Sequence, residues 1–361
     1  MKKRATIFLL SLIYIASFVF PTQLAYANDS KKQEGQKNPL GFSYKVIKPE
    51  NQKNPQVGYY DLRMMPGQKQ TVQIDLTNDG DQEVEVEVSI NGAKTNGNGV
   101  IEYGPSAIDN DKSLKYDFKD IVKGEESVKL PPKTTVPLKL AITMPDSSYD
   151  GMISGGIEMK RHISKQEQEK QKGVVNEYAF LVGMVLTETD TVVQPELKLN
   201  KVYAGLSNYR NSIFVNLSNI KAAILDDLTL DVQIMSKESD SVIYDTKKAG
   251  MRFAPNSMMD FPISMNGEKM VPGKYRAHVR ATSQDRKWEW DEEFTITDED
   301  ADKYNKQDVN LVQEQGINWK LIIPIVAGIF ILGLIIFFVV RMLNKKRAAK
   351  KKNAKKNNKS K

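Results

Sequence analysis

Apolar and polar residues alternate over most of the chain, which is the pattern of β-strands that bury one face. Residues 71–77 (TVQIDLT) place Val72, Ile74 and Leu76 on one face, and residues 83–90 (EVEVEVSI) repeat the pattern with four apolar residues. A turn-forming segment, Asn-Asp-Gly-Asp at 78–81, separates the two runs. Two alternating runs around such a turn predict a β-hairpin.

Further alternating runs fill the rest of the first half. They lie at residues 42–47, 134–143 and 151–159, whereas 114–122 is ambiguous. Pro137 indicates an edge strand, because proline cannot donate a hydrogen bond to a neighbouring strand. About seven strands with frequent turns and no convincing helix predict an antiparallel β-sandwich over residues 39–163.

A charged segment without apolar residues, 164–173, predicts a linker or loop at a domain boundary. Residues 178–186 are almost continuously apolar and predict a central strand of a second sandwich, over 174–298. Residues 222–227 predict a short helical turn. The other strands expected in this unit are 197–202, 212–217, 228–235, 241–244, 258–264, 275–281 and 289–297. The predicted fold class is all-β, with two tandem immunoglobulin-like antiparallel sandwiches.

One apolar run is long enough to cross a membrane. Residues 321–340 carry no charge, and as a helix they would span about 30 Å, the thickness of the hydrocarbon core. Eleven Lys and Arg residues and no acidic residue follow, which indicates the cytoplasmic side. We therefore predict one C-terminal transmembrane helix at 319–341 and a basic cytoplasmic tail at 342–361.

The other end of the chain resembles an export signal. Three basic residues precede an apolar run, and the small-x-small sequence Ala-Tyr-Ala at 25–27 fits a cleavage site. We predict a signal peptide at 1–27, a polar, disordered segment at 28–38, and a partly helical stalk at 299–318 in which Thr297 caps the helix.

Charge and cysteine content narrow the class of protein. The formal net charge of +7 comes from the two ends, and without them 38 Lys and Arg remain beside 45 Asp and Glu. A nucleic acid is therefore not a predicted partner. The chain has no cysteine, so the exported part must be stabilised by its cores, which is typical of Gram-positive surface proteins.

The sequence offers no set of catalytic or metal-binding residues, and we predict no enzyme, no metal and no cofactor. The two histidines, His162 and His278, lie in different units without the spacing of metal ligands. Residues 109–113 begin like a calcium loop, but Leu114 stands where that loop requires glycine. A binding protein is the better class.

Two segments combine tyrosine with amides and charged groups, the composition of glycan-binding surfaces, although ordinary loops share it. They are 51–63 and 91–103. The candidate glycan-binding residues are Asn51, Gln52, Tyr59, Tyr60, Asp61, Arg63, Asn96, Asn98 and Tyr103.

Short motifs in both halves add a family resemblance. In the first half they are 51–52, 58–62 (GYYDL), 66–68, 76–78 (LTN), 93–99 (AKTNGNG), 149–151 and 155–157; in the second they are 178–186, 206–208, 217–219 (LSN), 251–257 (MRFAPNS), 272–275 and 288–294. With these motifs the chain resembles the WxL-interacting proteins, which have a peptidoglycan-binding domain followed by a host-binding domain and a membrane anchor.

The resemblance implies a Gram-positive, single-pass cell-surface protein, with its N-terminal part in the cell wall. Its first domain would bind peptidoglycan, and its second WxL-domain proteins or host extracellular-matrix proteins. On the motif positions we select Arg252, Phe253 and Asn256 as candidate partner-binding residues. The alternatives are an assembly or folding factor for secreted surface proteins and, with less support, a regulator of cell-wall enzymes.

Overall fold

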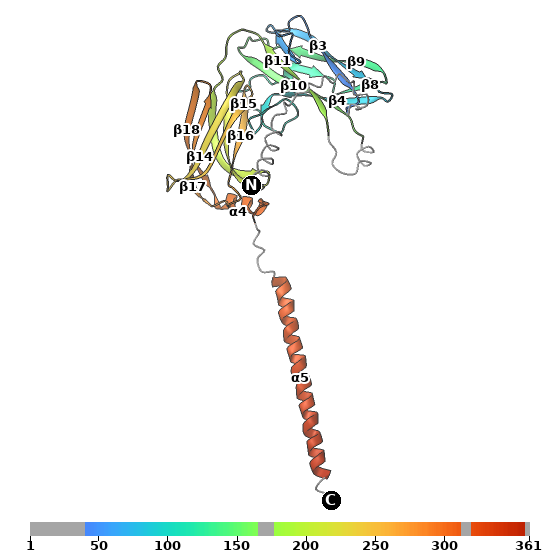
Figure 1. Ribbon diagram of the computed structural model, residues 1–361, viewed down its shortest axis with the longest axis vertical. Helices are drawn as coiled ribbons and strands as arrows, with labels where there is room; N and C mark the ends of the chain where they lie inside the picture. The colour runs from blue at the N-terminus through green and yellow to red at the C-terminus, as the bar shows by residue number, and fades with distance from the viewer. Residues whose placement is uncertain (1–39, 165–176, 312–318, 358–361) are drawn as a thin grey trace, which may run out of the picture.

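A computed structural model describes residues 40–164, 177–311 and 319–357 (Figure 1). Two β-sandwiches and one long C-terminal helix make up this part of the chain. The predicted all-β class with two tandem sandwiches and an apolar C-terminal helix is confirmed. The predicted signal peptide and the segment 28–38 lie outside the described residues.

The first sandwich packs a four-stranded sheet against a five-stranded one. Alternate apolar residues on the strands form a single core between them, with Ile74, Leu76 and Leu138 fully buried. The first sheet has the order β1 (Ser43–Ile47), β3 (Lys69–Asn78), β9 (Thr134–Thr143), β7 (Val122–Gly124). The second has the order β2 (Tyr60–Arg63), β11 (Ala179–Thr187), β10 (Met152–Arg161), β4 (Val84–Gly92), β8 (Ser127–Leu130).

Three small elements complete this unit. A hairpin of β5 (Lys94–Thr95) and β6 (Ile101–Glu102) follows β4. The ambiguous region 114–122 contains the short helix α2 (Phe118–Ile121). Asp117 caps this helix, since its side chain accepts a hydrogen bond from the backbone N–H of Lys119.

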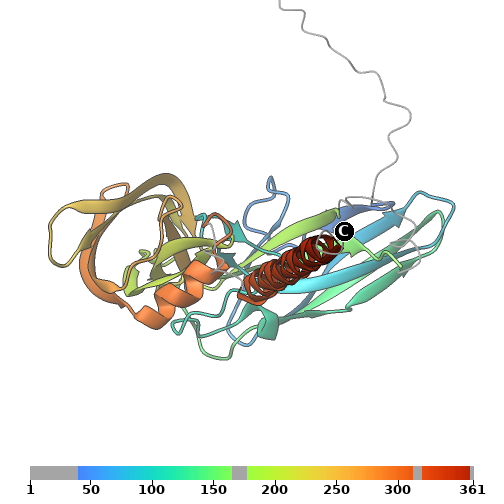
Figure 2. The same ribbon diagram turned by 90° about the horizontal axis from the view of Figure 1, so that it is seen from below.

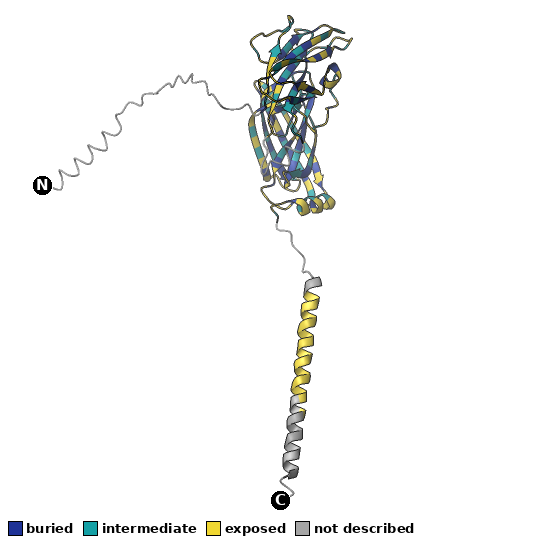
Figure 3. Ribbon diagram, turned by 90° about the vertical axis from the view of Figure 1, so that its right-hand side faces the viewer, coloured by how far each residue is buried: buried dark blue, intermediate teal, exposed yellow. Residues whose placement is uncertain are grey.

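The second sandwich has its own core, and buried residues occur along the strands of both sandwiches (Figure 3). A three-stranded sheet of β12 (Leu197–Ser207), β13 (Arg210–Asn219) and β16 (Ser257–Ser264) packs on a four-stranded one. The latter has the order β15 (Val242–Phe253), β14 (Leu225–Ser236), β17 (Gly273–Ser283), β18 (Arg286–Ile296). All strands predicted from residue 197 onward are present. The helical turn predicted at 222–227 is not formed, because this segment is a bend that leads directly into β14.

The hairpin predicted for 71–77 and 83–90 is wrong, because β3 and β4 lie in opposite sheets. Both strands face the same core, so their alternation is correct although their pairing is not. The crossing is held by Asn78, which is fully buried. Its Nδ2 donates to the carbonyls of Gln82 (2.8 Å) and Leu130 (2.9 Å).

The same device recurs in the second sandwich. Asn219 ends β13, where the chain also crosses to the other sheet, and it is fully buried. Its Nδ2 donates to the carbonyls of Ala223 (2.7 Å) and Ala254 (3.0 Å). The motifs LTN and LSN thus occupy equivalent positions in the two sandwiches, where the chain crosses from one sheet to the other. A buried asparagine satisfies carbonyls that the crossing removes from the ladders.

The strand at 178–186 belongs to the first sandwich, not to the second as predicted. As β11 it pairs antiparallel with β10 and parallel with β2. Val182, Met184 and Leu186 are buried in the first core. The charged segment before it is therefore the connection between two neighbouring strands, and residues 165–173 of it lie outside the described residues. An apolar run shows that a strand is central but not in which sheet.

Pro137 lies on β9, which has neighbours on both sides and so is not an edge strand along its whole length. It faces Asp75 of β3, whereas β7 pairs with β9 only at residues 140–142. The side of β9 beside Pro137 is thus free of β7, which explains why proline is tolerated there.

Part of the predicted stalk packs on the second sandwich (Figure 2). Helix α4 (Asp298–Gln307) begins at Thr297, whose side chain accepts from Asp300 N at 3.1 Å, as predicted. Ala301 is buried, and Asp308 accepts a hydrogen bond from Asn211 N at 2.6 Å. The remainder of the stalk, 312–318, lies outside the described residues.

Helix α5 (Trp319–Asn357) contains a segment, Ile322–Met342, that is long and apolar enough to cross a membrane. Its described apolar side chains are exposed (Figure 3), as expected for a surface that faces lipid.

Because β11 completes the first sandwich, a fragment ending at the predicted boundary, residue 163, should not fold. It loses three buried apolar side chains, each worth about 1.5–3 kcal/mol against a total stability of about 5–15 kcal/mol. The fragment 40–190 retains them and should melt cooperatively by circular dichroism. Equal cooperative melting of the two fragments would contradict the observed pairing of β11.

Candidate functional site

The hairpin β5–β6 reaches from the first sandwich onto β15 and β16 of the second. At its centre lies Thr95, which is fully buried. Its Oγ1 accepts from Ala254 N (2.9 Å) and lies 2.8 Å from Ser257 Oγ. The Ser257 hydroxyl donates to Ala254 O (3.0 Å), so the Thr95 hydroxyl donates to Ser257. These three hydrogen bonds form a closed ring across the two domains.

Other polar contacts surround this ring. Asn256 Nδ2 donates to both the carbonyl and the hydroxyl of Ser113, each at 3.1 Å. The buried Ser218 hydroxyl donates to the carboxylate of Asp111, which lies in the segment that resembles a calcium loop. Backbone N–H groups also donate across the boundary, from Met152 to Ala222 O and from Arg252 to Gly99 O, both at 2.8 Å.

Two glycines allow the domains to approach this closely. A Cβ on Gly97 would lie 2.6 Å from Asp260 O, and one on Gly151 would lie 2.3 Å from Ala222 O. Gly151 also has a φ of +91°, which side chains rarely adopt. The motifs 93–99, 149–151, 217–219 and 251–257 therefore meet at one junction between the domains.

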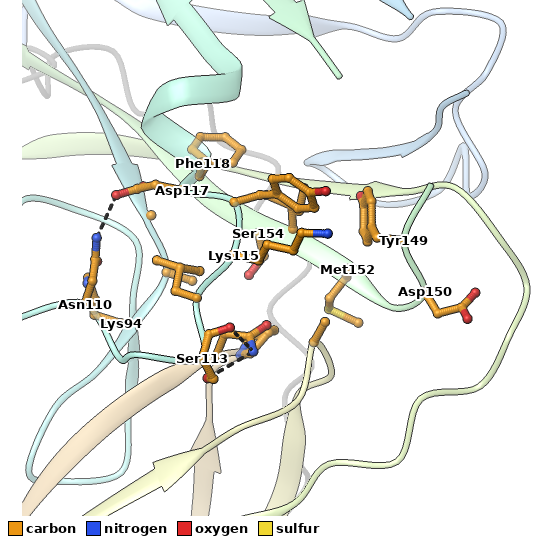
Figure 4. Close-up of a pocket in the computed structure, with 18 residues that line it drawn as sticks. Lys94, Asn110, Ser113, Lys115, Asp117, Phe118, Tyr149, Asp150, Met152 and Ser154 are labelled. Atoms are coloured by element: carbon orange, nitrogen blue, oxygen red, sulfur yellow. Dashed lines mark hydrogen bonds between the residues drawn. The ribbon is translucent and has the colours of Figure 1, made fainter. Parts of the chain in front are cut away.

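A cavity of about 180 Å³ lies at this junction (Figure 4). Both domains line it, and the rings of Phe118 and Tyr149 contribute to its walls. Burial lowers the pKa of Lys94, whose amine donates to Asn110. The Lys115 amine lies 4.8 Å from the centre of the Tyr116 ring, a cation–π contact. Asp150 points away from these groups and accepts from Thr189 (2.6 Å).

The outer face of the five-stranded sheet carries two tyrosines side by side. Gly156 of β10 pairs directly with Gly183 of β11, and neither has a side chain to fill the face. Tyr103 lies over Gly156, where an added Cβ would come 2.6 Å from the Tyr103 Cβ. Tyr59 lies over Gly183 in the same way, at 3.6 Å. We call Tyr59, Tyr103 and the neighbouring Leu181 the tyrosine shelf.

The tyrosine shelf is accessible, since Tyr59 is 40% exposed and Leu181 is 45% exposed. Burial raises the pKa of Tyr103, and the nearby Arg252 acts in the opposite direction. Arg252 belongs to the second domain and donates from Nε to Asp226 at 2.5 Å. The shelf therefore lies close to the domain junction.

A row of polar side chains runs beside the shelf. Asn91, which pairs with Gly156 on the neighbouring strand, donates to Ser89 Oγ at 3.1 Å. Ser89 in turn donates to Glu158 Oε2 at 3.2 Å. An aromatic surface beside amide, hydroxyl and carboxylate groups offers both the apolar and the polar contacts that sugars make.

Two family models match the chain. The model "WxL Interacting Protein, peptidoglycan binding domain" matches residues 42–161, and "WxL Interacting Protein, host binding domain" matches residues 169–306. The chain belongs to the WxL-interacting protein family. Both matched domains are binding domains and not catalytic ones, and a peptidoglycan-binding domain indicates a cell-surface, adhesin-like protein. The host-binding model includes β11, although this strand pairs within the first sandwich.

Solved structures share only the general fold with this WxL-interacting protein. The class 5 fimbriae chaperone CfaA is 9% identical, with 69% of this chain and 99% of that chain covered and a TM-score of 0.27. The E. coli chaperone DraB is 10% identical, with 71% and 98% covered and a TM-score of 0.26. The PapD-like domain 7 of human CEP192 is 12% identical, with 42% and 88% covered and a TM-score of 0.26. No curated protein matches the chain.

The structure brings together only some of the predicted glycan-binding residues of this WxL-interacting protein. Tyr59 and Tyr103 meet on the shelf. Asp61 lies on β2, the strand next to β11, on the side opposite the buried Tyr60 and Leu62. These three come from segments about forty residues apart in the chain, and remain candidates for contact with a ligand.

The other predicted glycan-binding residues have structural contacts. Tyr60 is fully buried and donates to Gln73 O at 2.6 Å, so its ring is not available on the surface. Asn51 donates to Arg63 O (2.8 Å) and Gln52 to Tyr59 O (3.0 Å), which closes their loop. Arg63 forms an ion pair with Asp190. The Asn96 side chain accepts from the backbone N–H groups of Asn98 and Val100 within its turn. The Asn98 side chain accepts from the Lys248 amine (3.1 Å).

Of the three predicted partner-binding residues, only Arg252 is exposed. Phe253 is fully buried in the second core, where its ring cannot meet a partner. Asn256 has a φ of +45° and bonds to Ser113 of the first domain. Arg252 is the exposed member, paired with Asp226. Core packing thus explains Phe253 and a contact between the domains explains Asn256, while Arg252 stays a candidate for contact with a partner.

Sequence reasoning missed Leu181, Ser89 and Glu158, and the glycine pair beneath the shelf. The signal for the glycines was present, because Gly155-Gly156 and Gly183 lie inside strand patterns. Glycine within a strand marks a place where another group comes close to the backbone. Their direct pairing follows only from the sheet register.

The hydrogen-bond ring predicts that Thr95→Val destabilises the folded protein. The valine keeps the shape but leaves Ala254 N without its buried acceptor, which should lower the free energy of unfolding by about 1–3 kcal/mol. Denaturant unfolding of residues 40–311 would measure this change. Thr143→Val, at an exposed position of β9, is the control and should lie within about 0.5 kcal/mol of the parent. Equal effects of the two substitutions would refute the role of the ring.

Proposed function

We propose that this protein is a non-catalytic scaffold that binds peptidoglycan with its first domain and a protein with its second. The tyrosine shelf is the observation that carries the first half of this proposal. A peptidoglycan sugar would stack its apolar face on Tyr59 and Tyr103, and its hydroxyl and acetamido groups would bond to the row from Asn91 to Glu158. The shelf lies on paired strands of one sheet, which would limit the ordering needed on binding.

The proposed partners of the second domain are WxL-domain surface proteins or host extracellular-matrix proteins. The family description of a host-binding domain supports this assignment. The outer face of the sheet β15-β14-β17-β18 would suit a protein partner, since it alternates acidic and basic groups. Arg280 pairs with Asp231 at 2.7 Å, and His278 lies 3.2 Å from Glu289 and 3.1 Å from Asp291. Such a pattern favours specificity through matched charges.

The junction supports a scaffold with a fixed geometry. Buried hydrogen bonds such as that between Thr95 and Ala254 hold the two domains in one arrangement. A ligand on the first domain then sets the position of a partner on the second. The proposed C-terminal membrane anchor, with the tail in the cytoplasm, would keep the protein close to the wall. Even weak sugar contacts then act at a high effective concentration.

Replacing Tyr59 by alanine should weaken binding to purified peptidoglycan sacculi about tenfold, which corresponds to about 1.4 kcal/mol. Tyr59 is exposed, so the fold should be retained. Co-sedimentation of residues 40–311 with sacculi over a concentration series would give the affinity.

Tyr209→Asn is the matched control. Tyr209 is 71% exposed in the second domain and has a φ of +58°, which asparagine tolerates. It should bind sacculi like the parent. If the parent does not sediment at all, the peptidoglycan half of the proposal fails. If the parent sediments and the Tyr59→Ala variant binds equally tightly, the assignment to the shelf fails.

The anchor predicts a second result, on localisation. A chain that ends at residue 311 lacks the segment Ile322–Met342 and should be released when the cell wall is digested, because no apolar span remains to hold it in lipid. The full chain should stay with the membranes after the same treatment. Fractionation followed by immunodetection separates the two cases. A truncated chain that remains in the washed membrane fraction would exclude α5 as the principal anchor.

A further inference from the structure

An open groove of about 590 Å³ adjoins the polar row beside the shelf. Ser89 and Glu158 belong both to the polar row and to the wall of the groove. Pro105, two residues after Tyr103, also forms part of this wall. The shelf and the groove are therefore one continuous surface of the first domain. The volume lies within the range of about 300–1,000 Å³ that is typical of sites for small ligands.

The groove exists because a strand pairing ends early. The ladder between β4 and β8 stops at Glu87 and Ser127, and Val88 N makes one more bond to Glu126 O at 2.8 Å. Beyond that point Ile90 of β4 borders the groove, and Lys123 of β7 borders it from the other sheet. An extended chain can lie along such strand edges.

The charged groups of the groove are of both signs. Glu87 and Lys160 form an ion pair at 3.9 Å, and Lys160 also pairs with Glu177 at 3.3 Å. Glu125 and Glu126 are exposed, and within the described part of the chain no ion pair engages either carboxylate. Lys119 and Lys123 also line the groove. Carboxylates and amines at short range suit a ligand that itself carries both charges, and disfavour a polyanion.

We propose that this groove binds the stem peptide of peptidoglycan while the sugar lies on the tyrosine shelf. The inference rests on the proposed function and specifies its ligand as a peptide-bearing muropeptide. A stem peptide is short, branches from the sugar, and carries carboxylates and the side-chain amine of a diamino acid. Glu125 and Glu126 would receive the amine, and Lys119 and Lys123 would receive a carboxylate. The strand edge of β4 would bond to the peptide backbone.

The test compares three soluble ligands by calorimetry with the full-length protein in detergent micelles. They are a disaccharide carrying a stem peptide with L-lysine, the same compound with its lysine amine acetylated, and the disaccharide without peptide. The first ligand should bind at least tenfold more tightly than the other two. The double variant Glu125→Gln and Glu126→Gln should remove the preference for the free amine and leave binding of the bare disaccharide unchanged.

Glu238→Gln, an exposed residue of the second domain, is the control and should keep the preference. If all three ligands bind equally, or the double variant still prefers the free amine, the groove proposal is overturned while sugar binding stands. If none of them binds, the proposed function fails and this proposal with it. The Tyr59→Ala variant separates the two surfaces, since it should weaken all three ligands by a similar factor.

Discussion

The structure depends on the satisfaction of buried hydrogen-bonding groups where the two sandwiches meet. An amide that loses water without gaining a partner costs about 1–3 kcal/mol, a large share of the stability of a domain. At the junction, Ala254 N, the Thr95 hydroxyl and the Ser257 hydroxyl each find a partner within one closed ring. These bonds link the two domains, so they favour the placement in which all three can form. The backbone hydrogen bonds across the junction and the close contacts at Gly97 and Gly151 favour the same placement of the domains.

This constraint explains why motif residues that look like binding residues are structural. Arg252, Phe253 and Asn256 combine a guanidinium, a ring and an amide, which is the composition of an interaction surface. In the fold Asn256 bonds to Ser113 of the first domain and Phe253 lies in the core of its own, whereas Arg252 is exposed and pairs with Asp226. The surface that we propose for peptidoglycan lies instead on the sheet beside the junction, where Tyr59 and Tyr103 come together because Gly156 and Gly183 leave room beneath them.

Local patterns determined which residues are buried but not which strands are neighbours. The alternation in β3 and β4 correctly assigns their inward faces, because the period of two depends only on the strand itself. The predicted pairing of β3 with β4 was wrong, since a crossing between sheets that is held by a buried asparagine resembles a hairpin turn in sequence. The same limit applies to β11, whose apolar character fits a central strand of either sandwich. Of the candidate site, the tyrosines were predictable from composition, whereas the glycine pair and the row from Asn91 to Glu158 depend on register between distant strands.

The proposed scaffold also depends on where the chain leaves the second sandwich. Helix α4 is held on the second sandwich by Asn211, which donates to Asn305 at 2.8 Å and whose backbone N–H bonds to Asp308. Asn305 in turn bonds to both backbone groups of Met270. The chain thus leaves the second sandwich at a fixed point before it continues to α5. The hydrogen bonds at the junction and at α4 favour one separation between the shelf and the outer face of the second domain. The proposed scaffold would need such a constraint, because a partner bound to one domain is presented at a defined distance from the wall only if the other domain is held in place.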